Sequence, residues 1–127
     1  MPIRILFACG GTAGHINPAL AVAGVLKKKH PDTQILFAGN PRGMEARLVS
    51  AAGYDFAPIH VLGFQRKLTL HNWKNNVMAA AYLLTASQRA AKIIRDFSPN
   101  VCMGTGGYVS GPVVRQAAKM GIPTLTH

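Results

Sequence analysis

The chain has 127 residues, enough for one compact domain with its own core, and its hydrophobic fraction of 49% gives no sign of a disordered segment. Its 14 Lys and Arg against 4 Asp and Glu give a formal net charge of +10, so we expect an anionic partner such as a phosphate group, a nucleic acid or an anionic membrane surface. The two cysteines form no disulfide or zinc pattern, no 18-residue apolar run predicts a transmembrane helix, and the N-terminal stretch MPIRILFACGG does not resemble a signal peptide. This composition favours a protein of the reducing cytoplasm whose membrane contact, if any, is peripheral.

Short apolar runs alternate with helical stretches along the whole chain. Such alternation is typical of βαβ units, whose right-handed crossovers build a parallel sheet covered on both faces. We therefore predict an α/β fold, a Rossmann-like doubly wound parallel sheet. The expected strands are residues 5–9, 34–39, 55–62, 100–104 and 123–127, and the expected helices are 17–30, 43–53, about 70–97 and 110–121.

Two glycine-rich loops follow predicted strands. GGTAGH (10–15) leaves the first strand, and GTGGYVSG (104–111) leaves the fourth, with Ser110 as an expected helix cap and Pro112 in the first turn. Glycines let backbone N–H groups approach an anion, and a helix N-terminus adds partial positive charge. Because these two strands are neighbours in the usual doubly wound order, we expect both loops to face one crevice that suits a diphosphate.

Neither loop matches a common nucleotide motif. There is no GxxxxGK[ST] sequence, and GGTAGH differs from GxGxxG. The second strand ends in Gly-Asn-Pro-Arg (39–42), where a dehydrogenase would carry an acidic residue for the ribose. These features disfavour a P-loop enzyme and an NAD-dependent dehydrogenase.

His15 closes the first loop and has two interpretations. It either packs the loop as an ordinary polar residue, or it serves as a general base or hydrogen-bond donor beside a diphosphate. Its position at the mouth of a cleft favours the second interpretation. His30 and His60 occupy ordinary helix-end and strand positions, and His71 is ambiguous.

Five segments together resemble the N-terminal half of the MurG family, the bacterial undecaprenyl-diphospho-muramoylpentapeptide N-acetylglucosaminyltransferases of peptidoglycan synthesis. They are GGTAGHINPALAVA (10–23), RGMEARLV (42–49), GFQRKLTLHNW (63–73), GTGGYVSGPV (104–113) and GIPTLTH (121–127). The resemblance implies a two-domain glycosyltransferase-B fold, in which residues 1–127 form the N-terminal domain that binds the lipid-diphosphate acceptor, lipid I. The family pattern continues beyond His127 into a domain that binds most of UDP-GlcNAc, so we expect a piece of a longer enzyme that is inactive alone.

The resemblance also implies an inverting transfer of GlcNAc from UDP-GlcNAc to the C4 hydroxyl of the muramoyl unit, a step of cell wall biogenesis tied to cell shape and division. It places His15 as the catalytic residue, without a metal or a cofactor. Ala13 stands where some relatives carry glycine, a small change that preserves close approach. The implied donor-binding residues are Thr12, Ala13 and Gly14, and the implied acceptor-diphosphate residues are Gly11, Gly14, His15, Gly106, Gly107, Tyr108 and Ser110.

Residues 62–84 mix apolar and basic side chains in a way that suits a membrane interface. The family is described as having a membrane patch here, which implies a peripheral protein on the cytoplasmic face of the bacterial plasma membrane. In the alternative interpretation, Trp73, Val77, Ala80, Ala81 and Leu84 follow helical spacing and form a core face. We expect the loop and the first helical turn to meet the membrane and the later turns to pack on the sheet. The predicted patch comprises Phe64, Arg66, Lys67, Leu68, Leu70, Trp73 and Lys74.

Two competing functions fit parts of the sequence. A glycosyltransferase-B domain with a non-lipid acceptor fits the loops but leaves the amphipathic segment unexplained. A basic nucleic-acid-binding module rests on the net charge alone, because the chain has no helix-turn-helix, zinc or RNP-type pattern. We therefore expect UDP-GlcNAc, lipid I and an anionic membrane surface as partners, and no nucleic acid.

Overall fold

The computed structural model describes residues 2–60, 73–107 and 109–127 of the chain. In this part, all strands belong to one parallel sheet with the order β3-β2-β1-β4-β5. The strands are β1 (Arg4–Cys9), β2 (Gln34–Gly39), β3 (Asp55–Pro58), β4 (Val101–Gly106) and β5 (Thr124–Thr126). The helices are α1 (Ala13–Lys29), α2 (Met44–Ala51), α3 (Trp73–Phe97) and α4 (Ser110–Lys119).

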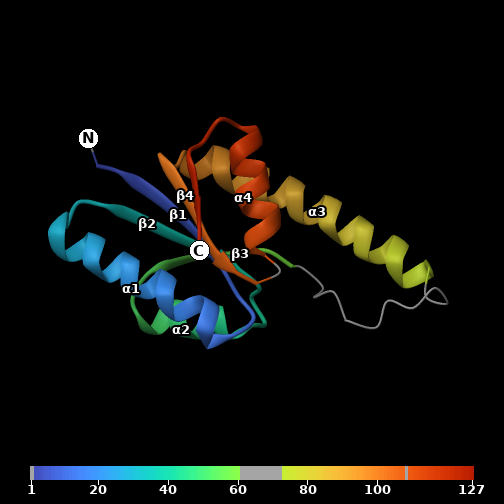
Figure 1. Cartoon of the computed structure of the whole chain (residues 1–127), viewed down its shortest axis with the longest axis horizontal. Coiled ribbons are helices and arrows are strands. Elements are labelled where there is room, and N and C mark those ends of the chain that lie inside the picture. Colours follow the sequence, from blue (N-terminus) through green and yellow to red (C-terminus); the bar gives the residue numbers. More distant parts are fainter. Residues whose placement is uncertain (1, 61–72, 108) are drawn as a thin grey trace.

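Helices cover both faces of the sheet, with α1 and α2 on one side and α3 and α4 on the other (Figure 1). Successive residues of β1 alternate between two cores, because side chains of a strand point to opposite faces. Phe7 packs with Phe37 and Ile16 on the α1 side, whereas Leu6 packs with Ile94 and Val113 on the α3 and α4 side. The predicted doubly wound sheet is therefore confirmed.

Three predicted boundaries need correction. Helix α1 begins at Ala13 rather than at residue 17, so Pro18 lies inside it. Pro18 lacks the N–H that would bond the Gly14 carbonyl, but Gly14 is exposed and water can take that place. Strand β3 ends at Pro58 instead of continuing to residue 62. Ser110 is not the cap of α4: Val109 is, without a side-chain bond, and the Ser110 side chain is turned against Gly104 of β4.

The described residues in the N-terminal half of α3 do not pack on the sheet as predicted. Val77 and Leu84 are 58% and 64% exposed, and among the residues of the helix whose exposure is described, the first buried one is Ala86. The reason is length: α3 has 25 residues and spans about 37 Å, whereas the six-residue β1 spans about 20 Å. The helix therefore extends past the sheet (Figure 1). The interpretation of this stretch as a core face is wrong for the residues whose exposure is described.

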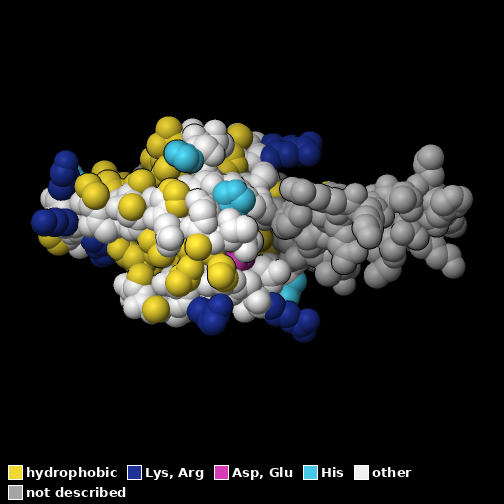
Figure 2. All heavy atoms as spheres, turned by 60° about the horizontal axis from the view of Figure 1, so that its bottom comes forward, with side chains coloured by type: hydrophobic (Ala, Val, Ile, Leu, Met, Phe, Trp, Pro, Cys, Tyr) yellow, Lys and Arg dark blue, Asp and Glu magenta, His cyan; other side chains and the backbone are white. Residues whose placement is uncertain are grey.

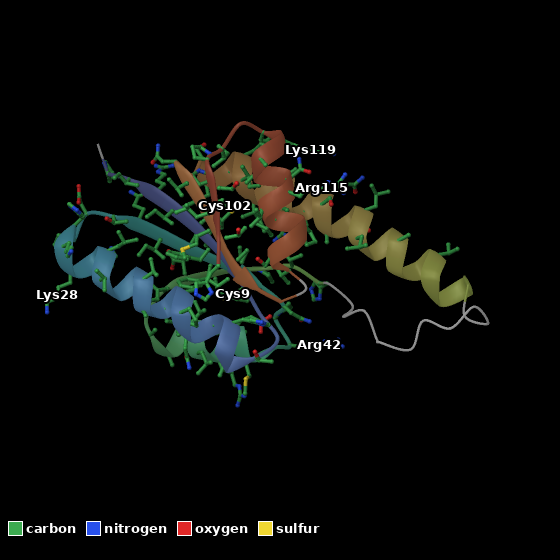
Figure 3. The ribbon with its side chains drawn as sticks, viewed as in Figure 1. Cys9, Lys28, Arg42, Cys102, Arg115 and Lys119 are labelled. Carbon is green, nitrogen blue, oxygen red and sulfur yellow. The ribbon has the colours of Figure 1, made fainter. Side chains whose placement is uncertain are left out.

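The two cysteines are buried on the sheet between the helix layers, as predicted (Figure 3). Burial raises the pKa of the Cys9 thiol to about 12; the Glu45 carboxylate adds to the rise, and a hydrogen bond with Thr105 opposes it. Burial raises the pKa of Cys102 to about 12 as well. Both thiols therefore stay protonated near neutral pH and act as small core residues.

In the coloured part of Figure 2, the lysine and arginine side chains lie at the edges of the face. Its middle is mostly hydrophobic and uncharged, with one acidic side chain showing. Among the described helices, none is long and apolar enough to cross a membrane. The described His, Cys, Asp and Glu residues form no group that could hold a metal ion.

Candidate functional site

The two glycine loops meet at the carboxyl edge of the sheet, because β1 and β4 are hydrogen-bonded neighbours. A Cβ atom on Gly106 would lie 2.6 Å from Cδ2 of His15, and one on Gly107 would collide with the backbone of Gly10. Both glycines also have positive φ, at 113° and 94°. The predicted convergence of the two loops is therefore observed, and only residues without a side chain allow so close an approach.

The first loop leads into the N-terminus of α1, and the first turn of this helix contains no acidic residue. Thr12 is the extended N-cap residue, and its side chain makes no capping bond. Its carbonyl accepts the N–H groups of His15 and Ile16 at 3.0 and 3.2 Å. The first N–H groups of a helix have no intrahelical partner, and here they lie beside the exposed Thr12 and Gly14. Thr12, Ala13 and Gly14, the residues predicted to bind the sugar donor, thus form an open helix N-terminus, which is a geometry that suits an anion.

His15 is half-buried in the first turn of α1, between the two loops. Its Nδ1 lies 3.1 Å from the Gly10 carbonyl oxygen and 3.4 Å from Oγ1 of Thr12. Because a carbonyl oxygen only accepts hydrogen bonds, the neutral imidazole carries its proton on Nδ1. The Nε2 atom is then the unprotonated nitrogen, which is the form that a general base requires.

Thr105 ties the second loop to the first and was missed in the sequence. Its hydroxyl is buried and donates to the His15 carbonyl at 2.6 Å. The pairing of β1 with β4 shifts here, since Ala8 pairs with Gly104 and Cys9 with Gly106. Bulges of this kind re-aim a side chain, and the unpaired Thr105 reaches α1. The sequence alone does not reveal this role, because 90 positions separate Thr105 from His15 and only the pairing of β1 with β4 brings them together.

Glu45 is the second residue that sequence reasoning missed. The sequence places it only in the predicted helix 43–53 and in the segment RGMEARLV, yet it is 1% exposed and its carboxylate accepts the N–H groups of Asn40 at 2.8 Å and Gly11 at 3.4 Å. A signal was available: acidic residues are scarce in this chain, and this one follows a glycine-rich turn by two positions.

The remaining predicted residues divide into three groups. Ser110 is buried with its hydroxyl toward β4, so the group it presents at the helix start is its backbone N–H. The residues outside the described part of the chain are Tyr108, Phe64, Arg66, Lys67, Leu68 and Leu70. Trp73 and Lys74 begin α3, but their side chains are not described. The membrane patch therefore stays a prediction.

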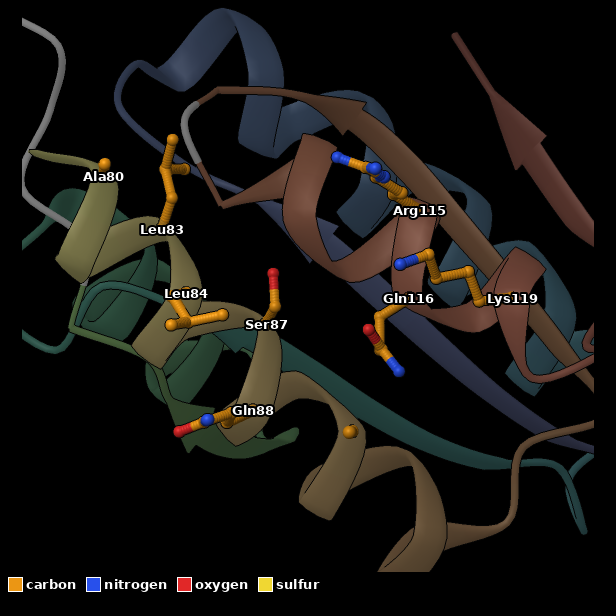
Figure 4. A pocket seen from close by; sticks show the side chains of 9 residues that line it. Ala80, Leu83, Leu84, Ser87, Gln88, Arg115, Gln116 and Lys119 are labelled. Carbon is orange, nitrogen blue, oxygen red and sulfur yellow. The ribbon is translucent and has the colours of Figure 1, made fainter.

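A groove of about 450 Å³ lies away from these loops, between α3 and α4 (Figure 4). Leu84 and Ser87 line it from α3, and Arg115 and Lys119 from α4. It contains none of the glycine-loop residues, so it is separate from the site described above.

A parallel sheet with two glycine loops and a helix N-terminus at its carboxyl edge defines a doubly wound α/β domain, the class of fold in which such an edge suits phosphate-bearing ligands. This chain belongs to glycosyltransferase family 28, because the model of that family's N-terminal domain matches residues 5–127.

Known proteins agree with this assignment. Curated relatives named UDP-N-acetylglucosamine–N-acetylmuramyl-(pentapeptide) pyrophosphoryl-undecaprenol N-acetylglucosamine transferase come from Acetivibrio thermocellus, at 47% identity, and Limosilactobacillus fermentum, at 48%. Each match covers 98% of this chain but 33% of the relative, so the chain spans about a third of their length. The crystal structure of Acinetobacter baumannii MurG superposes with a TM-score of 0.81 at 31% identity, covering 99% of this chain and 35% of that one. The predicted fold class and the MurG resemblance are thus confirmed.

The contact between the loops can be tested by adding a single methyl group. Gly107→Ala places a Cβ against the Gly10 backbone at a positive φ, so we expect a loss of about 2 kcal/mol or more in the free energy of unfolding. Gly111→Ala is the matched control, because its Cβ would meet no atom within 4 Å in α4, and alanine stabilises a helix by about 0.5–1 kcal/mol over glycine. Urea unfolding followed by circular dichroism measures both, and equal stabilities would contradict the contact.

Proposed function

We propose that this chain is the acceptor-binding N-terminal domain of an enzyme that transfers GlcNAc from UDP-GlcNAc to the C4 hydroxyl of the muramoyl unit of lipid I. The observation that carries the proposal is the convergence of the two glycine loops with His15 held between them. The names of the curated relatives supply the substrates. The product is then the disaccharide-linked lipid of peptidoglycan synthesis.

In this proposal His15 is the general base. Its Nε2 accepts the proton of the acceptor hydroxyl while the hydroxyl oxygen forms a bond to C1 of GlcNAc. The bond from C1 to the diphosphate oxygen breaks on the opposite face, so the configuration inverts and UDP leaves with the electron pair. The Gly10 carbonyl holds the imidazole in the required tautomer throughout.

The backbone supplies the binding of the two diphosphates. Thr12, Ala13 and Gly14 at the start of α1 face the donor, where the helix end stabilises negative charge as it develops on UDP. The acceptor diphosphate lies against the other edge of the crevice. Its proposed contacts are Gly11, Gly14, His15, Gly106, Gly107, Tyr108 and the backbone N–H of Ser110.

The membrane contact belongs to the same proposal. Val77 and Leu84 lie two helical turns apart, on one face of the part of α3 that extends beyond the sheet, and both are exposed. In the sequence, Val77 and Leu84 follow directly after the predicted patch of Phe64, Arg66, Lys67, Leu68, Leu70, Trp73 and Lys74. Together they suit peripheral binding at the cytoplasmic face of the plasma membrane, where lipid I would be presented.

Binding of the substrates tests the proposed function directly. Calorimetric titration of this chain with a water-soluble, short-chain lipid I analogue should show saturable binding, and UDP-GlcNAc should bind more weakly or not at all. A non-lipid muramoyl compound and duplex DNA at physiological salt serve as comparison ligands. Preference for either of them over the analogue would contradict the proposal in favour of the corresponding alternative.

The role of His15 requires the full-length enzyme that contains this domain. His15→Ala should lower kcat by about 10²–10⁴-fold, the usual contribution of a general base, with little change in the KM for the acceptor. Thr12→Ala is the control, because its hydroxyl lies 3.4 Å from the same Nδ1 but transfers no proton. An unchanged kcat in the histidine variant would remove His15 from the chemistry.

Charge reversal tests the membrane patch. Arg66→Glu with Lys67→Glu should weaken binding to vesicles rich in anionic phospholipid, because each cation near such a surface contributes about 1 kcal/mol. Lys27→Glu with Lys28→Glu makes the same charge change in the exposed last turn of α1, outside the predicted patch, and should leave binding nearly unchanged. Sedimentation with sucrose-loaded vesicles measures the binding of both variants. An equal loss of binding in the two would mean that only the net charge of the protein matters, which would contradict the patch.

A further inference from the structure

Glu45 places an almost fully buried carboxylate beneath the first glycine loop. The residue lies in the first turn of α2, two positions after the N-cap Gly43, and 1% of its surface is exposed. Its two oxygens reach different segments: Oε1 accepts the N–H of Asn40 after β2, and Oε2 accepts the N–H of Gly11 after β1. One side chain therefore joins the ends of two neighbouring strands.

Three glycines leave the space that this side chain occupies. A Cβ on Gly10 would lie 2.5 Å from Oε1 of Glu45, and one on Gly39 would lie 2.5 Å from its Cγ. A Cβ on Gly43 would collide with the same carboxylate. Because these glycines come from the first loop, the end of β2 and the start of α2, the fold around them is shaped to admit one acidic side chain.

Burial of a charge is costly unless hydrogen bonds and nearby positive charge offset it. Here two backbone N–H groups and the N-terminus of α2 do so. The carboxylate in turn anchors Gly11, which is exposed and has a φ of 88°. The N–H of Gly11 points back to the Glu45 carboxylate. The loop then enters α1 so that the following N–H groups form the open helix end at Thr12, Ala13 and Gly14.

We propose that Glu45 is a positioning residue that holds the first glycine loop in the conformation that receives a diphosphate. It touches no ligand itself and acts through the Gly11 N–H. The identity of the ligand rests on the proposed function, whereas the action on the loop does not.

Replacement of Glu45 by glutamine distinguishes the anchoring of Gly11 by the carboxylate from the mere filling of space by the side chain. Glu45→Gln keeps the size and shape of the side chain but has one acceptor oxygen in place of two. The shorter bond to Asn40 should keep that oxygen, which turns the NH₂ group toward the Gly11 N–H. Two donors then face each other, and the loop loses its anchor. Asp96→Asn is the control, since it removes the same charge from an exposed position on α3.

The experiment is amide hydrogen exchange by NMR on the ¹⁵N-labelled chain, followed by titration with inorganic pyrophosphate. In the wild type, the Gly11 amide should exchange at least about tenfold more slowly than in an unstructured peptide, although the residue is exposed. Glu45→Gln should remove most of that protection and weaken pyrophosphate binding about tenfold, while Asp96→Asn changes neither.

The outcomes distinguish this proposal from the proposed function. A Gly11 amide that is unprotected in the wild type would overturn the role of Glu45 without any variant. A glutamine variant with a lower melting temperature but unchanged Gly11 exchange and unchanged pyrophosphate affinity would overturn it as well. If the wild type shows a protected Gly11 and does not bind pyrophosphate, the positioning of the loop stands and the proposed function loses support.

Discussion

The parallel pairing of β1 with β4 is the constraint on which the rest of the site depends. It brings two loops that are almost a hundred residues apart into contact, with Gly107 against the backbone of Gly10 and Gly106 against the ring of His15. The same pairing contains the irregularity that turns Thr105 toward α1. A side chain at either glycine would separate the loops, and His15 would lose the surface against which it rests.

Electrostatics around the first loop come from a few local groups rather than from the net charge. The helix end of α1 has no acidic residue in its first turn, while a buried carboxylate lies on the opposite side of the loop with its oxygens bound to N–H groups. An anion arriving from solvent therefore meets the unpaired helix N–H groups first. The net charge of +10 comes from lysines and arginines spread along the chain, and those coloured in Figure 2 lie at the edges of the face it shows.

The α3 helix shows where periodicity alone misleads. The spacing of Val77, Ala80, Ala81 and Leu84 is that of an amphipathic helix, and it equally fits a face on the sheet or a face toward a membrane. The choice depends on where the sheet ends, which is a property of the strands and not of the helix. In the structure these four residues are exposed, and Ala86 is the first buried residue among those of the helix whose exposure is described.

The sequence by itself determined the strand and helix alternation, the doubly wound sheet, both glycine loops and the family, because these follow from local composition and from motifs of adjacent residues. It also singled out His15 from its place after GGTAG. Only the tertiary structure decided that Glu45 and Thr105 hold the loops, that the Gly10 carbonyl orients the His15 ring, and that Ser110 turns inward. The physical reason is that Glu45 and Thr105 act on residues 34 and 90 positions away, and the inward turn of Ser110 depends on the space above Gly104 of β4. Such contacts exist only once the strands have paired.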